Sequence, residues 1–134
     1  MRIFAAAVLV LIFSGCASIH EAGKTVWGSS IRQLEKHRAQ AISRTYHKGY
    51  WDCSQATLKV IEENKYTIFQ KDEIKGYIVI MGVPGYVDTT EVGIFFVEVS
   101  DNEVRIELSS LSTNAKRAVA KALFKALDKA LGNP

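Results

Sequence analysis

A closely spaced run of strand patterns between Tyr66 and Ser109 constrains the fold more than any other feature of the sequence. Four segments of this run are rich in aromatic and β-branched residues, and polar or glycine-containing turns separate them: residues 66–71, 77–81, 91–99 and 104–109. Parallel neighbours need a crossover of about a dozen residues, whereas antiparallel neighbours need only a turn. The run therefore predicts an antiparallel sheet.

Two helical patterns flank these strands. In residues 51–64 the apolar side chains recur with the period of a helix, which places Cys53, Val60 and Ile61 on one side. A second helix is predicted from its cap Ser112 to Leu131, because a broad apolar stripe runs along it and stop signals follow it. Each helix must bury its stripe, so we expect both helices on one face of the sheet.

A fifth strand and a short helix are predicted before the first long helix. Apolar or large residues alternate with small polar residues across residues 41–47, and residues 31–40 favour a short tether helix. The alternation of residues 104–109 is typical of a half-buried strand at a sheet edge. The predicted fold is therefore α+β, with about five strands in the order β-α-β-β-β-β-α.

This order, with a long C-terminal helix across an antiparallel sheet, resembles the helix-grip arrangement of accessory lipoproteins in the outer-membrane β-barrel assembly machinery. The segments VDTTEVGIFF (residues 87–96) and SSLSTNAKR (residues 109–117) also resemble those of small bacterial lipoproteins of uncharacterised activity. This second resemblance spans roughly residues 27–131. It implies a class of envelope lipoprotein and no particular activity.

The N-terminus carries a targeting pattern. Arg2 supplies a positive charge, Ile3–Phe13 is an unbroken apolar run, and Ser14-Gly15 supplies small residues at a cleavage point. The run is shorter than the roughly 20 apolar residues that a membrane-spanning helix needs. We therefore predict that residues 1–15 are a signal peptide.

The segment Phe13-Ser14-Gly15-Cys16 resembles the lipobox of bacterial lipoproteins, although Leu is more usual than Phe at its first position. The resemblance implies lipidation of Cys16, cleavage before it and attachment on the periplasmic side. Ala17 in place of Asp favours the outer membrane. Residues 16–40 would then form a lipidated tether and residues 41–134 a single domain. The alternative is an uncleaved anchor that extends through Ile19.

Cys16 and Cys53 are the only cysteines, so lipidation would leave Cys53 as a single thiol. Because unpaired thiols are unusual in oxidising compartments, we interpret Cys53 as a small buried hydrophobe on its helix. Loss of Arg2 with the signal peptide would leave the chain nearly neutral. Neither charge nor compartment favours a nucleic-acid partner.

No residue pattern typical of a catalytic or metal centre is found in the sequence. His20, His37 and His47 lack the spacing of a metal-binding pair, and Gly82–Gly85 lacks the Lys-Ser/Thr of a phosphate loop. The sequence therefore predicts no enzyme, no metal and no cofactor.

Two weaker candidate sites are polar. The cluster Asp88-Thr89-Thr90-Glu91 could hold a cation or a ligand, or it could satisfy the backbone of a loop that enters a strand. A basic stripe recurs every four residues on the last helix, with Lys116 alongside: Arg117, Lys121, Lys125 and Lys129. This stripe could face anionic lipid headgroups, or it could be a solvated helix face.

Both faces of the central strands are apolar: Tyr77, Val79 and Met81 oppose Ile78 and Ile80, and Phe95 and Val97 oppose Ile94 and Phe96. The tether helix, a protein partner or an apolar ligand could cover the second face. We expect a lipid-anchored envelope protein with a non-catalytic binding or structural role, acting through protein contacts near the membrane. The alternative is a carrier that holds an apolar small molecule between the C-terminal helix and the sheet, where that helix has small residues: Ala115, Ala118, Ala122, Ala126 and Ala130.

Overall fold

The computed structural model describes residues 30–132, and its contacts divide the chain into the units Met1–Arg32 and Gln33–Pro134. The predicted signal peptide, Cys16 and tether residues 17–29 lie outside the described residues. In residues 30–132, no helix is both long and apolar enough to cross a membrane.

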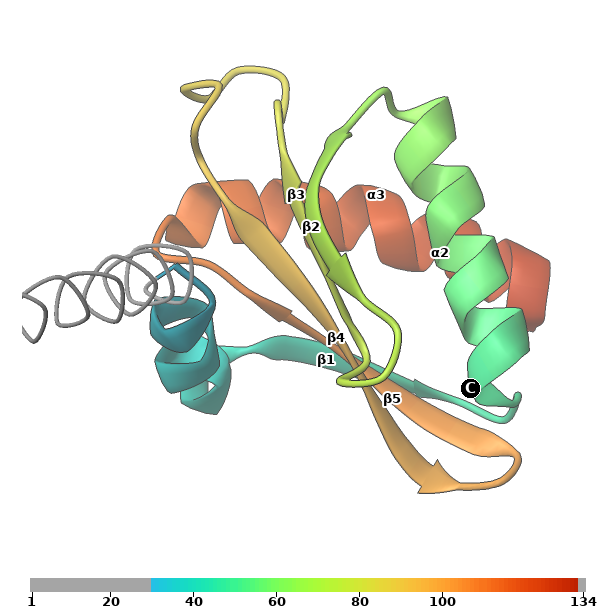
Figure 1. The fold of residues 1–134 in the computed structure, drawn as a ribbon. Coiled ribbons are helices and arrows are strands. Elements are labelled where there is room, and N and C mark those ends of the chain that lie inside the picture. Colours follow the sequence, from blue (N-terminus) through green and yellow to red (C-terminus); the bar gives the residue numbers. More distant parts are fainter. Residues whose placement is uncertain (1–29, 133–134) are drawn as a thin grey trace, which may run out of the picture. The chain divides into compact units, whose positions relative to one another are not determined.

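The described residues have the predicted order of elements (Figure 1). Residues 30–36 are helical, and the later elements are η1 (His37–Gln40), β1 (Ile42–Tyr46), α2 (Tyr50–Glu63), β2 (Thr67–Asp72), β3 (Tyr77–Met81), β4 (Val92–Ser100), β5 (Glu103–Ser109) and α3 (Thr113–Leu131). All five strands and both long helices lie within two residues of their predicted bounds. The short helix ends as a 3₁₀ turn, η1.

The five strands form one antiparallel sheet in the order β1-β5-β4-β3-β2. The prediction that residues 104–109 lie at an edge is wrong, because β1 pairs along β5 from Ile42↔Leu108 to Tyr46↔Val104. That pairing joins segments about 60 residues apart, which local alternation cannot reveal. The sheet edges are β1 and β2, and β2 carries a bulge between Ile68 and Gln70.

Helices α2 and α3 share one face of the sheet and form the main core with it. In Figure 1, α3 runs behind the strands, and α2 packs against α3. The strands contribute buried side chains that alternate along the sequence, and the helices contribute their apolar stripes. The largest fully buried side chain of this core is Tyr46, and the next largest are Ile80, Ile94, Ile106, Leu108, Leu123 and Leu127. At the start of α3, Ser112 accepts a hydrogen bond from Ala115 N (3.2 Å), as the sequence predicts.

The opposite face of the sheet is partly covered by residues 33–40. Leu34 is only 1% exposed, and its carbonyl accepts a 2.5 Å hydrogen bond from Ser109 Oγ. The guanidinium of Arg38 lies 4.5 Å from the ring centroid of Phe95. A Cβ at Gly93 would come within 3.3 Å of Leu34 Cδ1, so glycine lets this helix approach the strand closely. The sequence leaves three possible covers for this face: the tether helix, a protein partner or an apolar ligand. Of these, the end of the tether helix covers part of the face in the structure.

Candidate functional site

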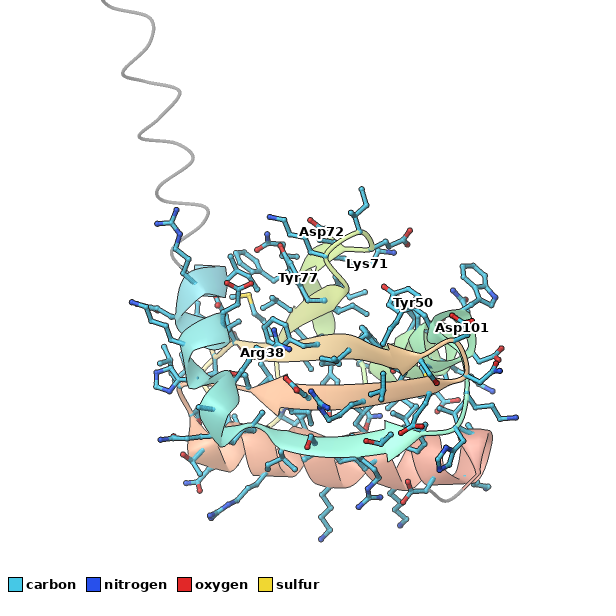
Figure 2. The ribbon with its side chains drawn as sticks, turned by 90° about the horizontal axis from the view of Figure 1, so that it is seen from below. Arg38, Tyr50, Lys71, Asp72, Tyr77 and Asp101 are labelled. Carbon is cyan, nitrogen blue, oxygen red and sulfur yellow. The ribbon has the colours of Figure 1, made fainter. Side chains whose placement is uncertain are left out.

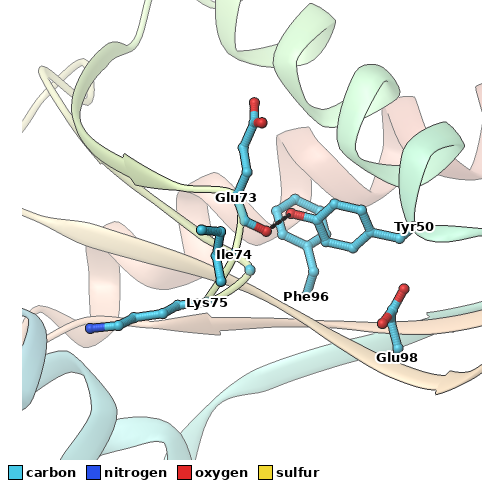
Figure 3. Close-up of a pocket in the computed structure, with 7 residues that line it drawn as sticks. Tyr50, Glu73, Ile74, Lys75, Phe96 and Glu98 are labelled. Atoms are coloured by element: carbon cyan, nitrogen blue, oxygen red, sulfur yellow. Dashed lines mark hydrogen bonds between the residues drawn. The ribbon is translucent and has the colours of Figure 1, made fainter.

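A pocket of about 260 Å³ opens where the turn between β2 and β3 meets the start of α2 (Figure 3). We call it the Tyr50 pocket, and its lining residues are Tyr50, Glu73, Ile74, Lys75, Gly76, Phe96 and Glu98. Figure 2 shows Tyr50 and Asp101 together at one end of the sheet, away from Arg38. The site therefore combines three segments: a helix start, a hairpin turn and the second half of β4.

Two aromatic side chains give the pocket its apolar wall. The rings of Tyr50 and Phe96 are 5.6 Å apart at 73°, an edge-to-face arrangement. The Tyr50 hydroxyl donates to the carbonyl of Glu73 (3.3 Å), which ties the ring to the turn. These intramolecular contacts fix the positions of both rings.

The hairpin turn is also locally fixed. The Asp72 carboxylate accepts hydrogen bonds from the backbone of Ile74 (3.0 Å) and Lys75 (2.8 Å), a typical Asx arrangement. Gly76 has φ +73°, and a Cβ there would lie 3.1 Å from the carbonyl oxygen of Phe96. Only glycine suits both the conformation and the close approach. The turn holds Ile74 fully exposed at the pocket rim.

The charged residues that line the pocket are two carboxylates, Glu73 and Glu98, and one ammonium, Lys75. Glu73 forms an ion pair with Lys71 (3.1 Å), whereas Glu98 has no ion-pair partner among the described residues. In Figure 3, the Glu98 carboxylate lies near the Tyr50 ring, and Lys75 extends away from it. Burial raises the pKa of Tyr50, and the nearby carboxylates of Glu73, Glu98 and Asp72 raise it further. These carboxylates therefore make the electrostatic potential at the Tyr50 hydroxyl more negative.

A second groove of about 360 Å³, somewhat more enclosed than the Tyr50 pocket, lies between α2 and α3 and is lined by Ala56, Lys59, Val60, Glu63, Ala126, Lys129 and Ala130. Neither this groove nor the Tyr50 pocket lies between α3 and the sheet. Of the alanines considered for a ligand space there, Ala115 is buried, Ala118 and Ala130 are exposed, and Ala122 and Ala126 are half-buried. Most of these alanines therefore face solvent or α2, and large aliphatic residues of α3 face the sheet.

The predicted basic stripe lies on the exposed side of α3, where Arg117, Lys121, Lys125 and Lys129 all reach solvent. We call these four residues the α3 basic face. The only acidic residue of α3 is Asp128, which accepts hydrogen bonds from Arg44 and from Tyr46 (2.8 Å). Lys116 does not belong to this face, because it is buried and its ammonium donates to the carbonyl of Gln40 (2.6 Å).

The polar cluster Asp88-Thr89-Thr90-Glu91 lies in the loop between β3 and β4, at the end of β3 opposite the Tyr50 pocket. Several backbone groups of the cluster are bonded: the carbonyl of Asp88 accepts from Gly82 N (3.3 Å), the N–H of Thr90 donates to the carbonyl of Val87 (2.8 Å), and the carbonyl of Glu91 accepts from Ser110 Oγ (2.6 Å). Within residues 30–132, no three His, Cys, Asp or Glu side chains converge as metal ligands. These contacts fit the loop-forming interpretation of the cluster.

Cys53 is fully buried on α2. Burial raises the pKa of its thiol to about 11, and the neighbouring Asp52 adds to this effect. The thiol is therefore protonated at neutral pH, which suits the predicted packing role.

The Tyr50 pocket was not among the sites that the sequence predicted. Tyr50 begins a helix, residues 73–76 form a turn, and Phe96 and Glu98 lie on β4, so no local motif connects them. The Asp-Glu-Ile-Lys-Gly turn exposes an apolar residue between charged ones, and this was the one available signal. The sequence matches no known protein-family model and no curated protein.

Proposed function

We propose that this protein is a lipid-anchored lipoprotein of the bacterial envelope, on the periplasmic side with the outer membrane favoured, whose domain binds a protein partner without catalysis. The anchor rests on the apolar run Ile3–Phe13 and the following Cys16. The binding role rests on one observation, the preformed Tyr50 pocket with a fully exposed Ile74 at its rim.

Exposed apolar side chains next in sequence to two lining residues support a protein partner. Trp51 follows Tyr50 on α2 and is 70% exposed, and Val99 follows Glu98 on β4 and is also exposed. Aromatic residues near a small pocket are typical anchors of protein interfaces. A partner that covers them would remove apolar area from water, at about 25 cal/mol per Å².

The carrier alternative has less support. The Tyr50 pocket, at about 260 Å³, is smaller than the roughly 300–1,000 Å³ typical of sites for drug-sized ligands. The larger groove of about 360 Å³ lies between α2 and α3, outside the space between α3 and the sheet that the carrier would use. Leu123 and Leu127 on α3 pack against the sheet and are almost completely buried. A small side chain from a partner therefore fits the described surface better than a free lipid does.

In-cell photo-cross-linking tests the proposal. A photoreactive amino acid at Ile74 should give a reproducible protein adduct, because this side chain is fully exposed at the pocket rim. The matched control is Val87, which is 73% exposed in the loop at the other end of β3. The chain should also fractionate with membranes, and the Cys16→Ser variant should not carry the lipid. Equal adducts from both positions, or none from Ile74, would contradict the binding role.

A further inference from the structure

We propose that the Tyr50 pocket binds one lysine or arginine side chain of the protein partner, an inference that rests on the proposed function. The aliphatic part of this side chain would lie against Ile74 and the aromatic rings. Its charged head would reach the carboxylate of Glu98.

The aromatic pair suits a cation. The faces of Tyr and Phe rings carry negative charge density, and they attract ammonium and guanidinium groups within about 6 Å of the centroid. The edge-to-face contact between Tyr50 and Phe96, together with the Tyr50–Glu73 hydrogen bond, holds these rings before binding. A preorganised site loses less entropy when it is filled.

The charges around the pocket also favour a cation. Lys71 is occupied by Glu73, and Lys75 points away from Tyr50 in Figure 3. Asp52 in the first turn of α2 offsets the positive end of the helix dipole. This leaves Glu98 as the lining carboxylate that lacks a described cationic partner. A bound ammonium or guanidinium would pair with it.

Size points to a single side chain. The pocket is open to solvent through its Ile74 rim and holds about 260 Å³. A stem of three or four methylene groups can pack along an apolar wall while its charged end stays near water, as lysine and arginine commonly do. The stem of such a side chain would pack against the aromatic wall while its charged end pairs with the Glu98 carboxylate.

The test uses NMR on the full lipidated chain in detergent micelles, with soluble probes for each chemistry. N-acetyl-lysine amide and N-acetyl-arginine amide should cause saturable shifts of the Tyr50 ring and Ile74 methyl resonances. N-acetyl-norleucine amide has a similar stem without the charge, and it should bind at least about 3-fold more weakly. Glu98→Gln should weaken lysine binding by roughly 3- to 10-fold, because it removes the charge and keeps the shape.

Glu62→Gln is the matched control, because Glu62 is an exposed carboxylate near the other end of α2. This substitution should leave lysine binding unchanged. The proposal is overturned if norleucine binds as well as lysine, if N-acetyl-glutamate amide binds better, or if glycerophosphoethanolamine binds better than both cationic amino acids. It is also overturned if no probe saturates.

The two hypotheses fail in different ways. An Ile74 cross-link that persists in Glu98→Gln, with no probe binding, would overturn the cation site and leave the partner in place. Saturable lysine binding without any cross-link from Ile74 would support the cation site and count against the proposed partner.

Discussion

At the scale of single residues, Asp128 ties the last helix to the edge strand. Its carboxylate accepts hydrogen bonds from Arg44 and Tyr46, and Arg44 lies 5.0 Å from the ring centroid of Phe124. Partial burial alone would raise the pKa of Asp128, but the bonds from Tyr46 and Arg44 outweigh it and lower the pKa. The charged carboxylate therefore stabilises the folded state.

We predict that Asp128→Asn lowers the free energy of unfolding at pH 7 by about 1–3 kcal/mol, because Tyr46 and Arg44 lose a charged acceptor. The wild-type contribution is fully present above the ordinary Asp pKa of 3.8 and is lost as pH falls below it through the lowered folded-state value. Urea denaturation at several pH values measures both effects. A variant that keeps the same stability difference from wild type at pH 7 and at pH 2 would contradict this account.

The two cysteines allow a count that tests burial and lipidation together. We predict that the purified mature protein shows almost no reactive thiol at pH 8 when folded, because Cys53 is buried and its pKa is raised to about 11. In denaturant it should show one thiol, since Cys16 would be acylated. Thiol titration and intact mass check this. Two thiols in denaturant would refute lipidation, and a fast folded-state reaction would refute burial.

At the scale of elements, residues 33–40 are fastened to the sheet at several points. Leu34 lies against Gly93 of β4, and Lys116 of α3 donates to the carbonyl of Gln40 at the end of η1. Glu107, whose side chain is only 13% exposed, pairs with Arg38 (2.8 Å) and Arg105 (2.9 Å). The predicted tether therefore contributes its last turns to the folded unit.

We predict that Leu34→Ala lowers the free energy of unfolding by about 2–5 kcal/mol, because it removes a buried side chain and leaves a cavity beside Gly93 of β4. Leu111→Ala is the control, since Leu111 is 62% exposed and should change stability by no more than about 0.5 kcal/mol. Chemical denaturation of the wild type and of both variants measures these differences in unfolding free energy. If Leu34→Ala is as stable as Leu111→Ala, residues 33–40 are only loosely attached to the sheet.

At the scale of the whole molecule, the α3 basic face is an exposed surface without described ion-pair partners. Its four cations lie on a helix whose only carboxylate is already bound by Arg44 and Tyr46. Such a face attracts anionic headgroups by about 1 kcal/mol per cation near a membrane surface. For an anchored domain, this attraction would set which side faces the bilayer.

We predict that a fluorophore on Ala118→Cys, beside the basic face, is quenched more strongly by headgroup quenchers in anionic vesicles than in zwitterionic ones. Raising the salt should weaken the effect, because the screening length is only about 10 Å at 0.1 M. Lys121→Glu with Lys125→Glu should abolish it, whereas reversing the exposed Lys48 and Lys65 should not. Equal quenching in both lipids would show that the face is simply solvated.

Local patterns were enough for the elements and for the fold class. The period-2 and period-3.6 patterns, the Ser112 cap and the turn residues act within a few positions, so each strand and helix could be predicted from its own segment. The buried setting of Cys53 followed in the same way from its place on an apolar helix stripe. The targeting pattern of residues 1–16 is also local, and it lies outside the described residues.

Only the tertiary structure decided which distant segments meet. It placed β1 outside β5, seated Leu34 on the second face, moved Lys116 from the basic face to the end of η1, and brought Tyr50, Ile74 and Glu98 around one pocket. These contacts depend on strand pairing and helix placement across tens of residues, and side-chain periodicity carries no information about partners at that distance. The sequence by itself therefore determined the elements and carries the targeting pattern, and the long-range packing determined the pocket at which we propose that a partner binds.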